Sequence, residues 1–245
     1  MLREGELQAA LSPLASFAAL DARVGLAERR ISLARGHARV PLPPGVPAAL
    51  AIRGALLHGW AGPFFAGQVA TLTAREPARL ALVLELPEGG PRPAHALLRA
   101  PAPPGTGAVL EVSATGTGRL ELPPFPPGPA ELVLLVRDLA PLVRRLELDP
   151  GPGVLALRPD GGASLELLVE DPQEGTLLGP GGTLALDGHV LPWAALSEAG
   201  TCRISGVPAD GVAHRLDLSL PGREPLTYWW RSEEHTSELQ SPNTI

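Results

Sequence analysis

Lysine is absent from this chain, and all 20 of its basic Lys or Arg side chains are arginine. Without lysine the chain can hold neither a P-loop lysine that binds phosphate nor a Schiff-base lysine. Asn, Ile, Tyr, Phe and Met, which also tend to use codons rich in A and T, are scarce as well. A GC-rich gene explains both gaps, so we expect a GC-rich bacterial source.

Cysteine is nearly absent too, since Cys202 is the only one. One thiol excludes an internal disulfide and any zinc or iron–sulfur site built from several thiolates. Cys202 lies in the strand-like stretch TCRIS, where a small buried side chain is expected.

Neither charge nor hydropathy points to nucleic acid or membrane. The net charge of −6 provides no basic surface, so no nucleic-acid partner is expected. No apolar run approaches the roughly 18 residues that span a bilayer. Glu4, Glu6 and Pro13 argue against a signal peptide. We expect no membrane insertion and, by default, a cytoplasmic location.

Common catalytic signatures are missing from the chain. It contains no G-x-S-x-G elbow, no H-E-x-x-H, no G-x-G-x-x-G opening a helix and no C-x-x-C. Glycosidases are not excluded, because their paired carboxylates leave no local motif. We expect the isolated histidines to be ordinary surface or turn residues, and we predict no catalytic residue, metal site or cofactor; these histidines are His37, His58, His95, His189 and His214.

The chain is rich in turn-forming residues, with 29 Pro and 28 Gly around short runs of alternating apolar residues. Period-two alternation between turns is the pattern of antiparallel strands that bury one face. We predict a mainly β fold with one or two antiparallel β-sandwich modules. The predicted strands are 49–56, 67–74, 78–86, 108–114, 118–122, 130–137, 144–149, 153–158, 164–170, 182–188, 201–207 and 214–220.

The N-terminal part reads differently. Ser12 and Pro13 fit the start of a helix, and apolar Leu14, Phe17, Leu20, Val24 and Leu26 follow close to helical spacing. We therefore predict one short amphipathic α-helix over 12–30.

Three native segments follow from these patterns. We predict an N-terminal helical segment over 1–36, a β-sandwich module over 37–148 and a second module over 149–230. Two stretches, 118–139 and 153–172, share a Gly-x-Leu-x-Leu start, and each is interpreted as a hairpin. The segment PPFPPGPAELVLLV (123–136) resembles a Pro/Gly turn and inward-facing strand of immunoglobulin-like and fibronectin-like sandwiches, and this loose resemblance implies only the architecture.

Clustered aromatics mark the candidate binding residues. Trp60 and Phe64 lie together in HGWAGPFF, and Asp187, His189 and Trp193 lie in DGHVLPW. Exposed aromatic faces next to polar groups bind sugar rings, whereas the same aromatics buried would only fill a core. Asp187-Gly188 is also the chemistry of a plain hairpin turn.

The last residues differ from everything before them. Segment 231–245, RSEEHTSELQSPNTI, resembles the in-frame translation of a sequencing-library adapter and holds the only Asn of the chain. We therefore expect it to be non-native and to replace the continuation of a longer protein beyond Trp230.

Together these features favour a non-catalytic β-sandwich accessory or binding region of a larger bacterial protein. Its expected partner is a carbohydrate or another domain of the same chain. One alternative is the N-terminal part of a glycosyltransferase, or of another glycan-active enzyme whose catalytic domain is truncated. A second alternative is a structural or adhesive module.

Overall fold

The computed structural model describes residues 6–12, 19–34, 36–53, 57–86, 90–169, 182–194 and 200–231. In this part the chain is mainly β: it forms 20 strands and no helix. No described segment is therefore a helix of the length and apolarity needed to cross a membrane. The chain divides into two compact units. Unit 1 comprises Met1–Glu85, Pro93–Leu134 and Val143–Arg158, and unit 2 comprises Leu86–Arg92, Leu135–Leu142 and Pro159–Ile245.

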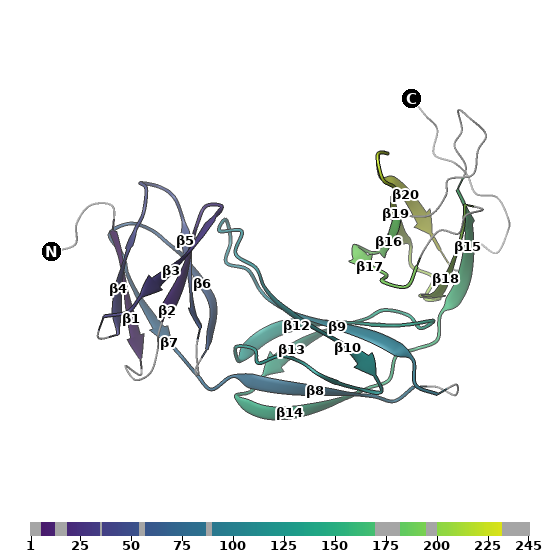
Figure 1. Ribbon diagram of the computed structural model, residues 1–245, viewed down its shortest axis with the longest axis horizontal. Coiled ribbons are helices and arrows are strands. Elements are labelled where there is room, and N and C mark those ends of the chain that lie inside the picture. Colours follow the sequence, from purple (N-terminus) through teal and green to yellow (C-terminus); the bar gives the residue numbers. More distant parts are fainter. Residues whose placement is uncertain are drawn as a thin grey trace. The chain divides into compact units, whose positions relative to one another are not determined.

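The first seven strands, in unit 1, form a sandwich of two sheets (Figure 1). One sheet has the order β4-β1-β7 and the other β3-β2-β5-β6. Alternate residues of both sheets, such as Leu7, Leu50 and Leu72, are fully buried between them. The strands are β1 (Glu6–Ser12), β2 (Ala19–Val24), β3 (Ala27–Ser32), β4 (His37–Pro41), β5 (Ala48–Arg53), β6 (His58–Phe64) and β7 (Val69–Thr73).

The next seven strands repeat this arrangement. One sheet has the order β11-β8-β14 and the other β10-β9-β12-β13. Leu82, Leu120 and Leu157 are buried from the first sheet, and Leu98 and Leu132 from the second. The strands are β8 (Ala78–Leu84), β9 (Pro93–Ala100), β10 (Leu110–Thr117), β11 (Arg119–Glu121), β12 (Gly128–Val136), β13 (Leu142–Leu148) and β14 (Gly151–Leu157).

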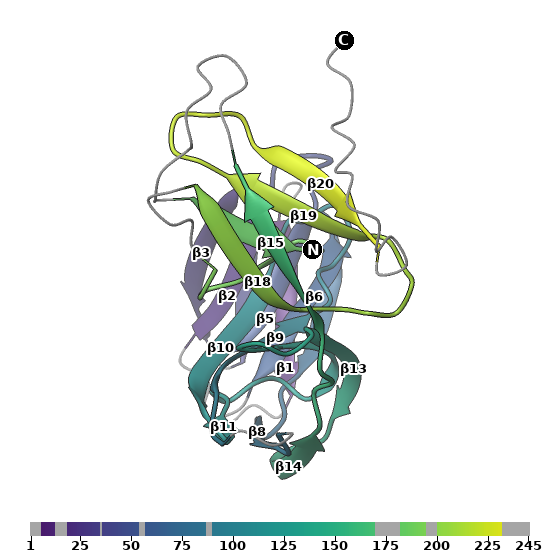
Figure 2. The ribbon, with the colours of Figure 1, turned by 90° about the vertical axis from the view of Figure 1, so that its right-hand side faces the viewer.

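The last six strands belong to unit 2 and follow the same plan. β15 pairs with β18, and these two strands lie side by side in Figure 2. The other sheet has the order β17-β16-β19-β20. Counted from the first strand of each set, all three sets have one sheet of order 3-2-5-6. The second sheet is 4-1-7 in the first two sets and 4-1 among the described residues of the third. The strands are β15 (Ala163–Leu168), β16 (Thr183–Leu186), β17 (His189–Val190), β18 (Thr201–Val207), β19 (His214–Ser219) and β20 (Leu226–Trp230).

The predicted N-terminal helix is wrong where the structure describes it. Residues 19–24 and 27–32 are the paired strands β2 and β3, joined by a turn at Gly25 and Leu26. Leu26, expected on the apolar face of the helix, is 95% exposed in this turn. The other part of the predicted helix, 13–18, lies outside the described residues.

The predicted strands are confirmed, but the two predicted hairpins are wrong. β11 pairs with β8, whereas β12 belongs to the other sheet of its set. Likewise β14 pairs with β8, and β15 pairs with β18. In each case the Pro-containing connection carries the chain from one sheet to another, so strands that are adjacent in sequence are not paired.

Candidate functional site

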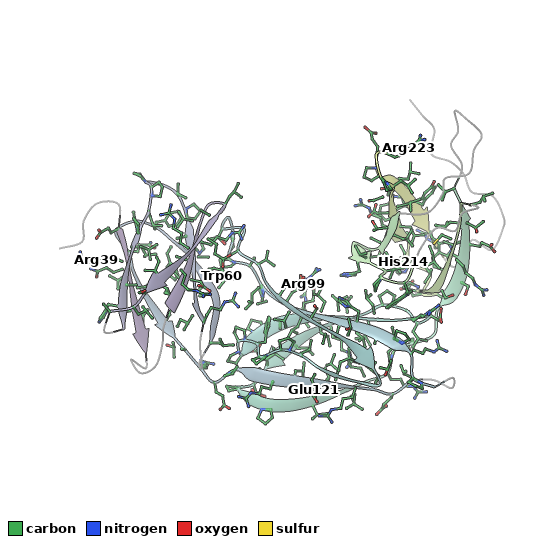
Figure 3. The ribbon with its side chains drawn as sticks, viewed as in Figure 1. Arg39, Trp60, Arg99, Glu121, His214 and Arg223 are labelled. Atoms are coloured by element: carbon green, nitrogen blue, oxygen red, sulfur yellow. The ribbon has the colours of Figure 1, made fainter. Side chains whose placement is uncertain are left out.

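The aromatic candidates of unit 1 serve mainly in packing. Trp60 is 8% exposed, and its indole Nε1 donates a hydrogen bond to the carbonyl oxygen of Val109 at 3.0 Å (Figure 3). Phe64 is half-buried against the core of the first sandwich. Both rings stabilise the fold, and neither offers a fully open face for stacking.

A groove of about 580 Å³ in unit 1 has Trp60 among its lining residues. Thr71, Thr73, Arg75 and Glu147 add polar groups to the lining. The Arg75 and Glu147 side chains are exposed. A hydroxyl-rich ligand would find a donor, an acceptor and part of one aromatic ring here.

Asp187 and His189 belong to a tight hairpin of unit 2. The turn between β16 and β17 has Asp187 at φ 49° and Gly188 at φ 81°, and positive φ at both central residues is what a type I′ turn requires. Leu186 pairs with His189 across it. Trp193 follows β17 and is half-buried. The hairpin-turn interpretation of Asp187-Gly188 is therefore confirmed.

The Asp187 carboxylate has a second role that the sequence did not reveal. Its Oδ2 lies 2.7 Å from Nδ1 of His214, and its Oδ1 accepts a hydrogen bond of 2.8 Å from the backbone N–H of Arg215. Nε2 of His214 lies 2.9 Å from Oδ1 of Asp210. One imidazole thus connects the β16–β17 turn, the loop before β19 and β19 itself. Figure 3 labels His214 in unit 2.

These contacts decide the charge of the imidazole. Burial by itself would lower the pKa of His214, but the hydrogen bonds and negative charges of Asp187 and Asp210 outweigh it, so the pKa is raised. The hydrogen bond from His214 and that from the backbone N–H of Val212 lower the pKa of Asp210. The two carboxylates favour the protonated imidazole, which can donate a hydrogen bond from each nitrogen. In this arrangement His214 acts as a structural clip that holds two loops against β19.

Cys202 is buried, as the sequence predicted, and burial raises the pKa of its thiol. A buried thiol with a raised pKa is a poor nucleophile. Within the described residues, no group of three or more His, Cys, Asp or Glu side chains has an arrangement that could hold a metal ion.

The predicted binding residues are divided between the two units. Trp60 and Phe64 belong to unit 1, and Asp187, His189 and Trp193 belong to unit 2. The residues that sequence reasoning missed are His214 and Asp210. Asp210 precedes His214 by four positions, a spacing that carries no motif, and Asp187 is 27 positions away from His214.

Comparison with known proteins assigns no family. No family model matches the chain, and no curated protein matches its sequence. Among solved structures, a streptococcal ancillary pilin is 11% identical with a TM-score of 0.26, over 93% of this chain and 95% of that chain. The major pilin subunit of Bacillus cereus is 10% identical with a TM-score of 0.22, over 94% and 97%. A candidate adhesin from Bacteroides ovatus is 9% identical with a TM-score of 0.25, over 93% and 95%. Similarity at this level carries no argument about function.

Proposed function

We propose that the chain is a non-catalytic structural or adhesive region in which β-sandwich units follow one another along the polypeptide. The observation that supports this best is the strand order. Sheets of order 4-1-7 and 3-2-5-6 occur in β1–β7 and again in β8–β14, and β15–β20 continue the series. Sandwiches of this kind recur in many cell-surface domains, where they space and present interaction sites.

The use of polar and aromatic groups supports the same function. The Asp21 carboxylate is nearly buried and accepts from Nε of Arg30 at 3.1 Å and Nε of Arg53 at 3.2 Å, across three strands of one sheet. Trp60 and His214 are likewise engaged in contacts that hold strands or loops together. Carboxylate, imidazole and indole groups, which often act in catalysis or binding in enzymes, therefore stabilise the fold in these three places.

Mechanical unfolding of the full chain tests the proposal. A tandem of sandwiches should unfold under force in separate steps. Each seven-strand set should release roughly 220–290 Å of chain less its folded end-to-end distance, because an extended residue spans about 3.3–3.6 Å. A single step for the whole chain, or turnover of a glycan by the purified protein, would contradict it.

Glycan binding is a second candidate, favoured by the groove that Trp60 lines. Arg75 and Glu147 would hydrogen-bond hydroxyl groups while the accessible part of the indole contacts a sugar ring. A glycan array with the full chain tests this, with Arg75→Ala and Glu147→Ala as the site variants. Trp229→Ala, which changes a 68% exposed side chain of unit 2, is the control. Binding that is absent, or equal in all four proteins, would rule the groove out.

No arrangement among the described residues favours the enzymatic alternative. That alternative would place the chemistry in residues outside this chain.

A further inference from the structure

Among the described residues, the third strand set has no counterpart of the seventh strand of the first two sets. In the first two sets the seventh strand pairs with the first strand in parallel, as β7 does with β1 and β14 with β8. In unit 2, β15 has β18 as its one partner among the described strands. The position of the seventh strand is therefore open in the described part of unit 2, beside the outer edge of β15.

The backbone of β15 is arranged for such a partner. The amide of Val169, directly after β15, donates to the Gly200 carbonyl on the β18 side at 2.9 Å. Since successive amides of a strand point to opposite edges, the amides of Ser164, Glu166 and Leu168 point to the other edge. In the first set, the amide of Gln8 holds the same kind of position and donates to Gln68, just before β7, at 3.1 Å.

Side-chain burial agrees with an open position. On β1 the core-facing Leu7 and Ala9 are 0% and 1% exposed. On β15 the corresponding face carries Ala163, Leu165 and Leu167, of which only Leu167 is buried. Leu165 is half-exposed although Ile204, its partner on β18, is buried. A strand that brings apolar residues, as β7 brings Ala70 and Leu72, would cover this face.

The sequence position of the missing strand is also defined. β7 begins soon after β6, at Val69 following Phe64, and β14 begins at Gly151 following Leu148. The corresponding strand of unit 2 would start within a few residues of Trp230. Segment 231–245 has only two apolar residues, Leu239 and Ile245, and lacks the period-two alternation that is typical of a half-buried strand.

We propose that unit 2 is completed by a seventh β-strand that pairs in parallel with β15 and that follows Trp230 in the natural polypeptide. Its chemistry is that of β7: a run of about five residues with apolar side chains, such as alanine and leucine, at every second position. Its carbonyl groups accept from the amides of Ser164, Glu166 and Leu168. The proposal does not depend on the proposed function.

Grafting tests the proposal. Residues 231–245 are replaced by a copy of 65–75, which contains β7, and in a second protein by a copy of 149–158, which contains β14. The matched control is the first graft with aspartate at the two positions copied from Ala70 and Leu72. Hydrogen exchange is measured by NMR for single amides of β15, at several protein concentrations.

We expect at least one graft to slow exchange at Ser164, Glu166 and Leu168 at least about tenfold relative to the original chain and to the aspartate control. The amides of Leu165 and Leu167, which face β18, should change less than about twofold, and they report that unit 2 is folded. If they stay protected and neither graft protects the outer three, the proposal is wrong. Protection of the outer three in the original chain that grows with protein concentration would assign the edge to a second copy and also overturn it.

The source gene provides a test that does not require any graft to fold. Read past the codon for Trp230, it should encode alternating apolar residues within about ten codons. A polar or helical pattern there would refute the proposal.

Discussion

Gly206 is the glycine at which a methyl group should do most damage in unit 2. It lies in β18 at φ 83°, beside the irregularity where Ala163 and Ser164 pair with Val207 and Ser205. A Cβ at this position would run into the backbone of Leu139, in the segment 135–142 that packs on β18. The obstacle is main chain, so it cannot move aside as a flexible side chain would.

Two costs add up in Gly206→Ala. An alanine in the left-handed region costs about 1–2 kcal/mol, and forcing an extra carbon into a packed site costs about 1–3 kcal/mol. Gly222→Ala is the matched control, since Gly222 has φ 72° and nothing within 4 Å of a built Cβ. The control variant has only the strain of the left-handed backbone and no steric clash. We expect Gly206→Ala to lose about 2–5 kcal/mol of unfolding free energy and Gly222→Ala about 1–2 kcal/mol.

Thermal and urea unfolding of the full chain measure both variants. The two units can unfold in separate transitions, so the one assigned to unit 2 is followed. A loss of 1 kcal/mol lowers the Tm of a small domain by about 4–8 °C, so the Tm for Gly206→Ala should fall by at least about 8 °C. Equal losses in the two variants would refute the packing of 135–142 against β18.

Three further predictions follow from single contacts. Because the folded pKa of His214 is raised, its contribution to the stability of unit 2 is full below about pH 6.5, the ordinary histidine pKa, and is lost as the pH rises through the folded pKa. His214→Gln should remove this pH dependence of the Tm, measured from about pH 5 to about pH 9, a range that brackets the ordinary histidine pKa. A Tm profile that is unchanged in the variant would contradict the structural role of His214. Asp21→Asn should cost about 1–3 kcal/mol in urea unfolding, against less than about 0.5 kcal/mol for the exposed Glu121→Gln, and equal effects would contradict the role of Asp21. Trp60→Phe replaces the indole by a smaller phenyl ring that cannot donate to Val109, so the lost hydrogen bond should cost about 0.5–1.5 kcal/mol and the lost buried volume should add to it; no loss in the same assay would show that this bond does not stabilise unit 1.

Alternation revealed several strands in which large apolar residues mark the buried face. β12 and β18 were predicted because Leu132, Leu134, Cys202 and Ile204 stand at every second position and are buried. Strands whose buried face is largely alanine were missed. β9 buries Ala94 and Ala96 along with Leu98, and β4 buries Ala38 with Val40. Alanine is compatible with a helix, a strand or a surface, so it does not reveal which face is buried.

The predicted helix failed for a related reason. Leu20 and Val24 are four residues apart, a spacing that fits one face of a helix and also alternate positions of a strand. The residue that decides between them is Ala22, which is 0% exposed and continues the period of two. Because Ala22 is small, the sequence pattern gave it little weight. Gly25, at φ 58°, then turns the chain back where a helix was expected to continue.

The candidate site was less predictable than the strands, because its contacts join distant segments. The chemistry of Asp187 as a turn residue could be predicted locally, but its bond to His214 depends on β16 and β19 lying side by side. Trp60 shows the same limit. Its sequence neighbours fit a core position and a sugar-binding face equally well, and only the carbonyl of Val109 distinguishes them.

The repeat in the sequence and the repeat in the structure are different repeats. The stretch 118–139 covers the fourth and fifth strands of the second set, whereas 153–172 includes the seventh strand of that set and the first strand of the next. Their likeness therefore relates strands that are not equivalent. Equivalent strands such as β1, β8 and β15 share only a buried face and a place in the order. What recurs is the alternation and the position of the crossings between sheets, and many residue choices satisfy both. A strand that completes unit 2 should therefore be recognisable by its alternation and place rather than by identity to β7 or β14.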